Sequence, residues 1–90
     1  MSLQEQFDEA AAKVKNLKSL PSDADLLELY GNFKQATVGD ADESKKPGFF
    51  DFKAKAKFEA WLGRKGVSKE DAQKAYIAKV DSLVSSIGLQ

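Results

Sequence analysis

A tyrosine, a phenylalanine and a lysine at helical spacing form the group most suggestive of chemistry. In YGNFKQATVGD, Tyr30, Phe33 and Lys34 are spaced i, i+3 and i+4, so a helix would place them on one face. A structural interpretation makes this face the rim of a hydrophobic core. A functional interpretation makes it a surface for a flat, anionic group, since rings stack and lysine binds anions. The pattern alone leaves both interpretations open.

A second group is a local excess of positive charge. Between residues 45 and 57 a single acid, Asp51, stands against five lysines: Lys45, Lys46, Lys53, Lys55 and Lys57. On a helix, Lys53 and Lys57 lie one turn apart and project together, whereas Lys55 points away from both. This stretch is either a solvated helix face with a basic loop or a phosphate site.

Composition removes most catalytic chemistry. The 90 residues include no cysteine and no histidine, so thiolate nucleophiles, zinc fingers and the commonest acid–base group are excluded. The serines therefore have no histidine to activate them. We find no phosphate-binding loop, dinucleotide motif, metalloprotease motif or EF-hand, and we predict no metal site and no enzymatic activity.

Charge and hydropathy limit the kinds of partner that the protein could bind. Fourteen basic residues balance fourteen acidic ones, which argues against a general nucleic-acid binder. The sequence has no signal-peptide pattern and no run of about 18 apolar residues, so we expect a soluble, cytoplasmic protein. Ninety residues suit one domain, 1–90, with one modest core.

Apolar residues recur at helical spacing in four segments. The first helix is predicted over residues 3–17, limited by Pro21. The second follows a capping box at Ser22–Asp25 and ends near Val38, with Gly39 as its stop. Within it, Asn32 and Gln35 interrupt the apolar stripe without suggesting a polar network.

The remaining two helices follow a long connection over residues 40–50. The third is predicted over 51–64, ended by Lys65–Gly66, on the apolar stripe Phe52, Ala56, Phe58, Trp61 and Leu62. The fourth follows a second capping pattern at Ser68 and is the longest. No segment alternates at period two, so no strand is predicted.

Four amphipathic helices must bury their stripes against one another, which predicts an all-α four-helix bundle. Short turns near 18–22 and 65–68 favour antiparallel neighbours. The long connection at 40–50 allows the second and third helices to run in the same direction.

The sequence also resembles a known family over essentially its whole length. YGNFKQATVGD, then KPG, DFKAKAKFEAW and GVSKEDAQKAYIAKV, in this order and spacing, are similar to the acyl-CoA-binding proteins. The resemblance implies an up-down-down-up four-helix bundle, a monomer, and a medium- or long-chain fatty acyl-CoA thioester as ligand. It implies no cofactor.

The resemblance also implies roles for individual residues. Phe33 takes the position that stacks on the adenine. The ribose 3'-phosphate is surrounded by Tyr30, Lys34, Lys57 and Tyr76. Lys53, and Lys15 on the first helix, complete the polar contacts, and Gly31 and Asn32 belong to the same binding motif. The acyl groove is lined by Phe7, Ala11, Leu26 and Leu27.

Several positions depart from residues that are frequent in the family. Phe33 stands where tyrosine is common, so its ring has no hydroxyl. Ala54 replaces a glycine, Phe58 a tryptophan and Lys46 an arginine, and the segment 40–47 is one residue longer than in many members.

The function that follows is that of an intracellular carrier and pool former for acyl-CoA, which also allows transient contact with enzymes that use acyl-CoA or with membranes. An alternative from another class is a helical protein-interaction module or the precursor of a signalling peptide. A third alternative is a thioesterase or isomerase that acts on the same ligand. It is the weaker alternative, because the sequence has no histidine, no cysteine and no fused domain.

Overall fold

Each helix begins at a residue whose side chain accepts a hydrogen bond from a backbone N–H one turn later. The computed structural model describes residues 1–48 and 50–90, so the part of the predicted 40–50 connection at Phe49 lies outside the described residues. The caps are Ser2, Ser22, Asp51 and Ser68. They start α1 (Leu3–Val14), α2 (Asp23–Thr37), α3 (Phe52–Leu62) and α4 (Lys69–Ile87), and a single 3-10 turn, η1 (Glu43–Lys45), lies in the long connection.

The capping prediction is half right. At Ser22 the hydroxyl accepts from the Asp25 N–H at 3.2 Å, but the Asp25 carboxylate lies 2.7 Å from Lys79 Nζ of α4. The complete capping box lies at the start of α1, where Ser2 Oγ accepts from Glu5 N and Glu5 Oε1 accepts from Ser2 N. This capping box was not predicted from the sequence.

The first helix ends earlier than predicted, at Val14 rather than residue 17. The chain after it is bound to the C-terminal residues: Lys18 N donates to Gly88 O at 2.9 Å, and Gln90 N donates to Asn16 O at 2.8 Å. Leu17 and Leu89 form an isolated antiparallel bridge there. The described residues otherwise contain no extended strand, as predicted.

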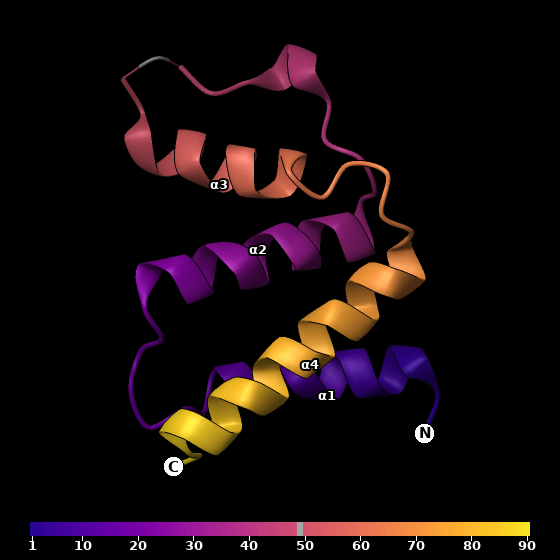
Figure 1. Ribbon diagram of the computed structural model, residues 1–90, viewed down its shortest axis with the longest axis vertical. Helices are drawn as coiled ribbons and strands as arrows, with labels where there is room; N and C mark the ends of the chain where they lie inside the picture. Colours follow the sequence, from indigo (N-terminus) through magenta and orange to yellow (C-terminus); the bar gives the residue numbers. More distant parts are fainter. Residues whose placement is uncertain (49) are drawn as a thin grey trace.

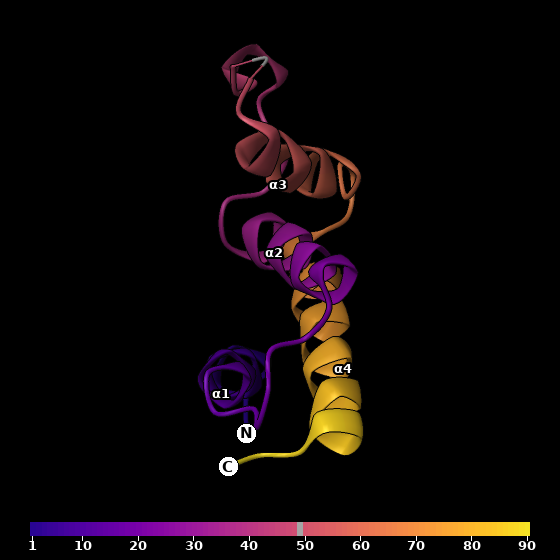
Figure 2. The same ribbon diagram turned by 90° about the vertical axis from the view of Figure 1, so that its left-hand side faces the viewer.

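The helices form a flat bundle with the predicted up-down-down-up order. Figure 1 shows α1 running in one direction, α2 and α3 in the opposite one, and α4 returning obliquely from the end of α2 across α1. Helix α1 packs on α4, α4 on α2, and α2 on α3. Turned by 90°, the molecule is thin, with α3 and α1 at opposite ends (Figure 2), and its principal extents are 37 × 28 × 14 Å. None of the helices in residues 1–48 and 50–90 combines the length and apolar character needed to cross a bilayer.

The main core lies between α1, α2 and α4. Its buried residues are Phe7, Ala10, Leu17, Leu29, Ala36, Ala72, Tyr76, Val80 and Leu83. Helix α3 contributes buried Phe58, whose ring meets that of Trp61 edge to face. Phe52, predicted on the apolar stripe of this helix, is instead 74% exposed. Among the described residues, helix α3 packs chiefly on α2.

A polar cluster fixes the C-terminal end of α2. Gln35 is 1% exposed, and its Nε2 donates to Asp40 Oδ1 and to Val67 O, both at 2.8 Å. Asp40 Oδ1 also accepts from Gly66 N at 2.9 Å, which holds the pKa of this carboxyl below its usual value, with a smaller contribution from Gln35. The sequence pattern did not suggest this network, in which Gln35 takes part. We call these four residues the Gln35 clasp.

Candidate ligand-binding site between helices α2 and α3

An apolar groove of about 480 Å³ lies between the N-terminal halves of α2 and α3. Because the two helices run in the same direction (Figure 1), their first turns flank the groove together. Its lining residues are Asp23, Leu26, Leu27, Phe52, Lys53, Ala56 and Lys57. Leu26 and Leu27, predicted to line an acyl groove, and Lys53 and Lys57, predicted to bind an anion, thus lie on one surface.

Two lysines on the facing helices α2 and α3 lie over aromatic rings, and one of them, Lys57, lines the groove. Lys57 Nζ of α3 lies 5.5 Å from the ring centroid of Tyr30, and Lys34 Nζ of α2 lies 4.9 Å from that of Trp61. A ring face attracts an ammonium group without carrying a full opposite charge. These contacts therefore position both lysines while leaving their charge available to an anion.

The carboxylates of α2 are directed elsewhere. Lys79 of α4 lies 2.7 Å from Asp25 Oδ1 and 3.1 Å from Glu28 Oε2. The hydrogen bond from Lys79 holds the pKa of Asp25 below its usual value, and that to Asp25 holds the pKa of Lys79 above its own. In the part of the chain that the structure describes, Lys34, Lys53 and Lys57 have no carboxylate within 4 Å.

Gly31 sets the distance between α2 and α3. A Cβ atom at this position would lie 2.5 Å from the Ala60 carbonyl oxygen of α3, which is closer than side chains tolerate. Gly31 is buried at this crossing, so its predicted place in the binding motif corresponds to helix packing beside the groove.

Tyr30, Phe33 and Lys34 do not share one set of neighbours. Phe33 and Lys34 are consecutive, so they are about 100° apart around the helix. Tyr30 and Lys34 contact α3, whereas Phe33 lies against Phe7 of α1 and Tyr76 of α4, at centroid distances of 5.6 and 5.8 Å. The spacing predicted one face, but the structure has two adjacent surfaces, one toward α3 and one toward α1 and α4.

The ring cluster of Phe7, Phe33 and Tyr76 joins α1, α2 and α4. Phe7 and Tyr76 are 3% and 4% exposed and 5.0 Å apart, and burial raises the pKa of the Tyr76 phenol. Phe33 is 38% exposed, so part of its ring is open to a ligand. Phe7, predicted as groove lining, lies in this cluster and not among the residues of the α2–α3 groove.

Three other predicted residues lie apart from the groove. Asn32 is 3% exposed, and its Oδ1 is buried with no partner among the described residues. Ala11 packs against the main core. Lys15 is exposed at the C-terminal cap of α1, across the molecule from α3 (Figure 2).

Several residues that shape the site were not predicted from the sequence. Phe52 and Ala56 line the groove, and Trp61 both supports Lys34 and donates from Nε1 to Gly39 O at 2.7 Å. Phe52 and Ala56 each stand one position before a lysine that was predicted to bind an anion, and this adjacency could have indicated their place in the site. No group of carboxylates able to hold a metal ion is found within residues 1–48 and 50–90.

Comparison with known proteins matches this arrangement to one family. The model of the acyl CoA binding protein family matches residues 4–80. The acyl-CoA-binding protein homolog of Manduca sexta is 70% identical over all 90 residues of both chains. The acyl-CoA-binding protein homolog 1 of Caenorhabditis elegans is 56% identical over 82 residues, which cover 91% of this chain and 94% of that one.

Solved structures agree in fold. The crystal structure of acyl-CoA-binding protein 2 of Oryza sativa is 45% identical, with a TM-score of 0.87 over 94% of this chain and 93% of that one. The solution structure of the yeast acyl coenzyme A binding protein is 49% identical, with a TM-score of 0.75 over 94% of this chain and 98% of that one. With its four-helix order and its matched residues 4–80, the chain belongs to the acyl-CoA-binding protein family.

Proposed function

We propose that this protein binds medium- and long-chain fatty acyl-CoA thioesters and acts as an intracellular, non-enzymatic carrier that maintains a pool of them. The observation that carries the proposal is the joining of an apolar groove to lysines held on aromatic supports. An acyl-CoA has the same two parts, a long apolar chain and an anionic nucleotide. Family membership supports binding as the function, since the relatives are named for acyl-CoA binding.

The polar part of the proposed site is the region of Tyr30, Lys34 and Lys57. The ribose 3'-phosphate carries nearly two negative charges, and charge-assisted hydrogen bonds are about twice as strong as neutral ones. Lys53 adds positive charge at the groove, the family resemblance assigns Lys15 on α1 to the same ligand, and the exposed part of Phe33 offers a stacking surface for adenine. Tyr76 supports Phe33 from the core.

The apolar part is the groove of Leu26, Leu27, Phe52 and Ala56. Each methylene removed from water contributes about 0.8 kcal/mol, so about ten sheltered methylenes supply about 8 kcal/mol before the costs of association are subtracted. Chain length therefore sets much of the affinity. Residues 1–90 act as one acyl-CoA-binding domain, a monomer in the cytoplasm that needs no cofactor and exchanges ligand with acyl-CoA-using enzymes or membranes.

Calorimetric titration with palmitoyl-CoA, palmitate and coenzyme A tests the two-part site. We expect palmitoyl-CoA to bind far more tightly than either part alone. If palmitate bound as tightly as the thioester, the phosphate anchor would be absent and the proposal would fail. Incubation with palmitoyl-CoA and a free-thiol assay provides the check against an enzyme, since sustained thiol release would require hydrolysis.

A further inference from the structure

A closed set of contacts joins Lys34, Gly39 and Trp61 at the C-terminal end of α2. Gly39 N donates to the Lys34 carbonyl oxygen at 3.3 Å, and Trp61 Nε1 donates to the Gly39 carbonyl oxygen at 2.7 Å. The set is completed by Lys34 Nζ, which lies 4.9 Å from the centroid of the Trp61 ring. Each of the three residues therefore contacts the other two, and we call them the Trp61 brace.

The hydrogen bond from the Trp61 indole aims its ring. The accepting residue, Gly39, has a φ of 98°, a backbone conformation that glycine adopts without strain. The next residue, Asp40, is held in the Gln35 clasp, so the accepting carbonyl group belongs to a turn that is itself fixed. The indole is therefore restricted in its rotation, and its face stays toward Lys34.

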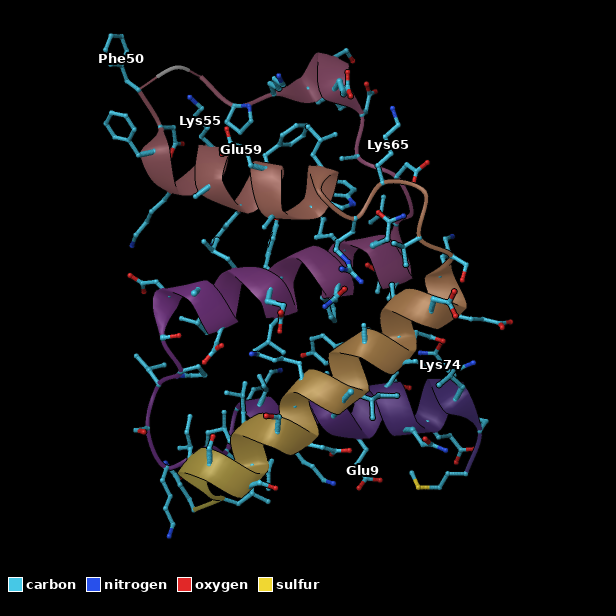
Figure 3. All side chains as sticks on the ribbon, viewed as in Figure 1. Glu9, Phe50, Lys55, Glu59, Lys65 and Lys74 are labelled. Carbon is cyan, nitrogen blue, oxygen red and sulfur yellow. The ribbon has the colours of Figure 1, made fainter. Side chains whose placement is uncertain are left out.

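The carboxylates nearest to the brace in the sequence are directed elsewhere. Asp40 belongs to the Gln35 clasp, and Glu43 lies 3.7 Å from Lys65 in the turn after α3. Figure 3 shows Glu59 on the outer side of α3, away from α2. The Lys34 ammonium group is thus held by a ring and remains available to an anion.

We propose that Trp61 is a positioning residue that holds Lys34 in place for the ribose 3'-phosphate of the ligand. This inference rests on the proposed function, because it names the residue that prepares one lysine of the phosphate region. Trp61 acts through Lys34 and not by its own contact with the ligand. Both parts of the indole are needed, since the ring face holds the ammonium group and the N–H group aims the face.

The physical advantage of the brace is preorganisation. A lysine that is free to rotate loses rotamer freedom when it binds a ligand. In the brace this freedom is already lost in the folded protein, so Lys34 contacts the phosphate at a lower cost in entropy. The advantage is confined to ligands that carry the phosphate, because Lys34 does not line the α2–α3 groove that takes the acyl chain.

Calorimetric titration with palmitoyl-CoA and with palmitoyl-3'-dephospho-CoA tests this role. The ratio of the two dissociation constants measures how much the phosphate contributes to binding. Trp61→Phe keeps a ring but removes the N–H group, and it should lower this ratio about fivefold while the affinity for the dephospho ligand stays unchanged. Trp61→Leu removes the ring as well and should lower the ratio further. A purely structural role for Trp61 would instead weaken the binding of both ligands alike.

Two further variants separate positioning from packing. Phe58→Leu also removes a ring from α3 but leaves the three contacts of the brace, so it should lower the stability and keep the wild-type ratio. In a Lys34→Ala background, Trp61→Phe should not change the ratio further, because it acts through Lys34. An equal fall of the ratio in Phe58→Leu, or a full effect of Trp61→Phe without Lys34, would overturn the proposal.

Nuclear magnetic resonance tests the brace in the wild-type protein, without any substitution. The Lys34 Cε protons should resonate upfield of the usual lysine position, because the side chain lies over the face of the Trp61 ring. The absence of this shift would show that the ring does not hold Lys34 in solution, and the proposal would fall.

The same titrations keep this proposal distinct from the proposed function. If the wild type bound both thioesters with equal affinity, the phosphate anchor of the proposed function would fall together with the brace. If the wild type distinguished the two thioesters and Trp61→Phe did so equally well, the proposed function would stand and the positioning role of Trp61 alone would fall.

Discussion

Lysines on the two sides of α2 contact opposite kinds of group, carboxylates on one side and aromatic rings on the other. Toward α4, Lys79 is 24% exposed in its side chain and lies within 3.1 Å of two carboxylates, Asp25 and Glu28. Toward α3, Lys57 and Lys34 lie over the rings of Tyr30 and Trp61. The first arrangement neutralises the charge and joins two helices. The second holds the charge in place without neutralising it, which is what an anion-binding surface requires.

The group that a lysine contacts is therefore more informative than the position of the lysine in the sequence. All three lysines lie on amphipathic helices with ordinary helical patterns. Only the acidic or aromatic neighbour, supplied by another helix, separates a structural lysine from one suited to bind a phosphate. Four experiments test this contrast.

The greatest loss is predicted for a substitution that forces α2 away from α3. Gly31→Ala places a Cβ atom 2.5 Å from the Ala60 carbonyl oxygen, and overpacking of this kind costs about 3 kcal/mol. We expect urea denaturation to show that loss and calorimetry to show weaker acyl-CoA binding. Gly63→Ala is the control, since its nearest contact would be 3.4 Å, and unchanged stability in Gly31→Ala would show that the crossing is not fixed at this residue.

The next effect concerns affinity on the α3 side. Lys57→Ala removes one charge from the ring-supported pair and should weaken palmitoyl-CoA binding by about 2 kcal/mol, since hydrogen bonds to charged groups contribute about that amount. Helix content by circular dichroism should remain unchanged. Lys79→Ala is the matched control and should keep wild-type affinity. Equal affinities for wild type and Lys57→Ala would remove Lys57 from the site.

A smaller effect on stability is expected on the α4 side. Lys79→Ala leaves Asp25 and Glu28 without their shared cation and should lower the free energy of unfolding by about 1 kcal/mol, because partly exposed ion pairs contribute little more. Lys57→Ala should change it by less than about 0.5 kcal/mol. If the two variants lost equal stability, the contrast between the two sides would not hold.

The smallest effect is a dependence of stability on pH. The pKa values of Asp25 and Asp40 are held below the ordinary value of 3.8, chiefly by hydrogen bonds from Lys79 and from the Gly66 N–H. Their contribution is therefore present above about 3.8 and lost as the pH falls through the lowered values. The raised pKa of Lys79 means that its contribution is lost only above 10.5. Asp40→Asn should reduce the loss of stability in acid urea titrations, and an unchanged acid profile would contradict the role of the Gln35 clasp.

Sequence was a good guide to local structure. The serines that start α2 and α4, and Gly39 after α2, act within a few residues of where they stand, so the helix bounds there are predicted to within a residue. The end of α1 was missed because it depends on Gly88 and Gln90, which lie about 70 residues away or more. A local pattern cannot contain a contact of that kind.

The site shows the same limit. Helical spacing grouped Tyr30, Phe33 and Lys34, but the register between α2 and α3 decides that Lys34 meets Trp61 and Tyr30 meets Lys57. In the sequence, Gln35 is only a polar residue on an apolar stripe. Its hydrogen bonds to Asp40 and Val67, which lie in two different loops, are visible only in the structure. The family resemblance supplied the ligand class, whereas the pairing of rings with lysines required coordinates.

The packing of α1 on α4 also has a consequence for the speed of folding. These helices stand at opposite ends of the sequence, and the hydrogen bond from Gln73 to Gln4 spans 69 residues. Closing so large a loop costs chain entropy before its contacts are gained. We therefore expect this protein to fold more slowly than helical bundles of equal size whose helices contact only their sequence neighbours.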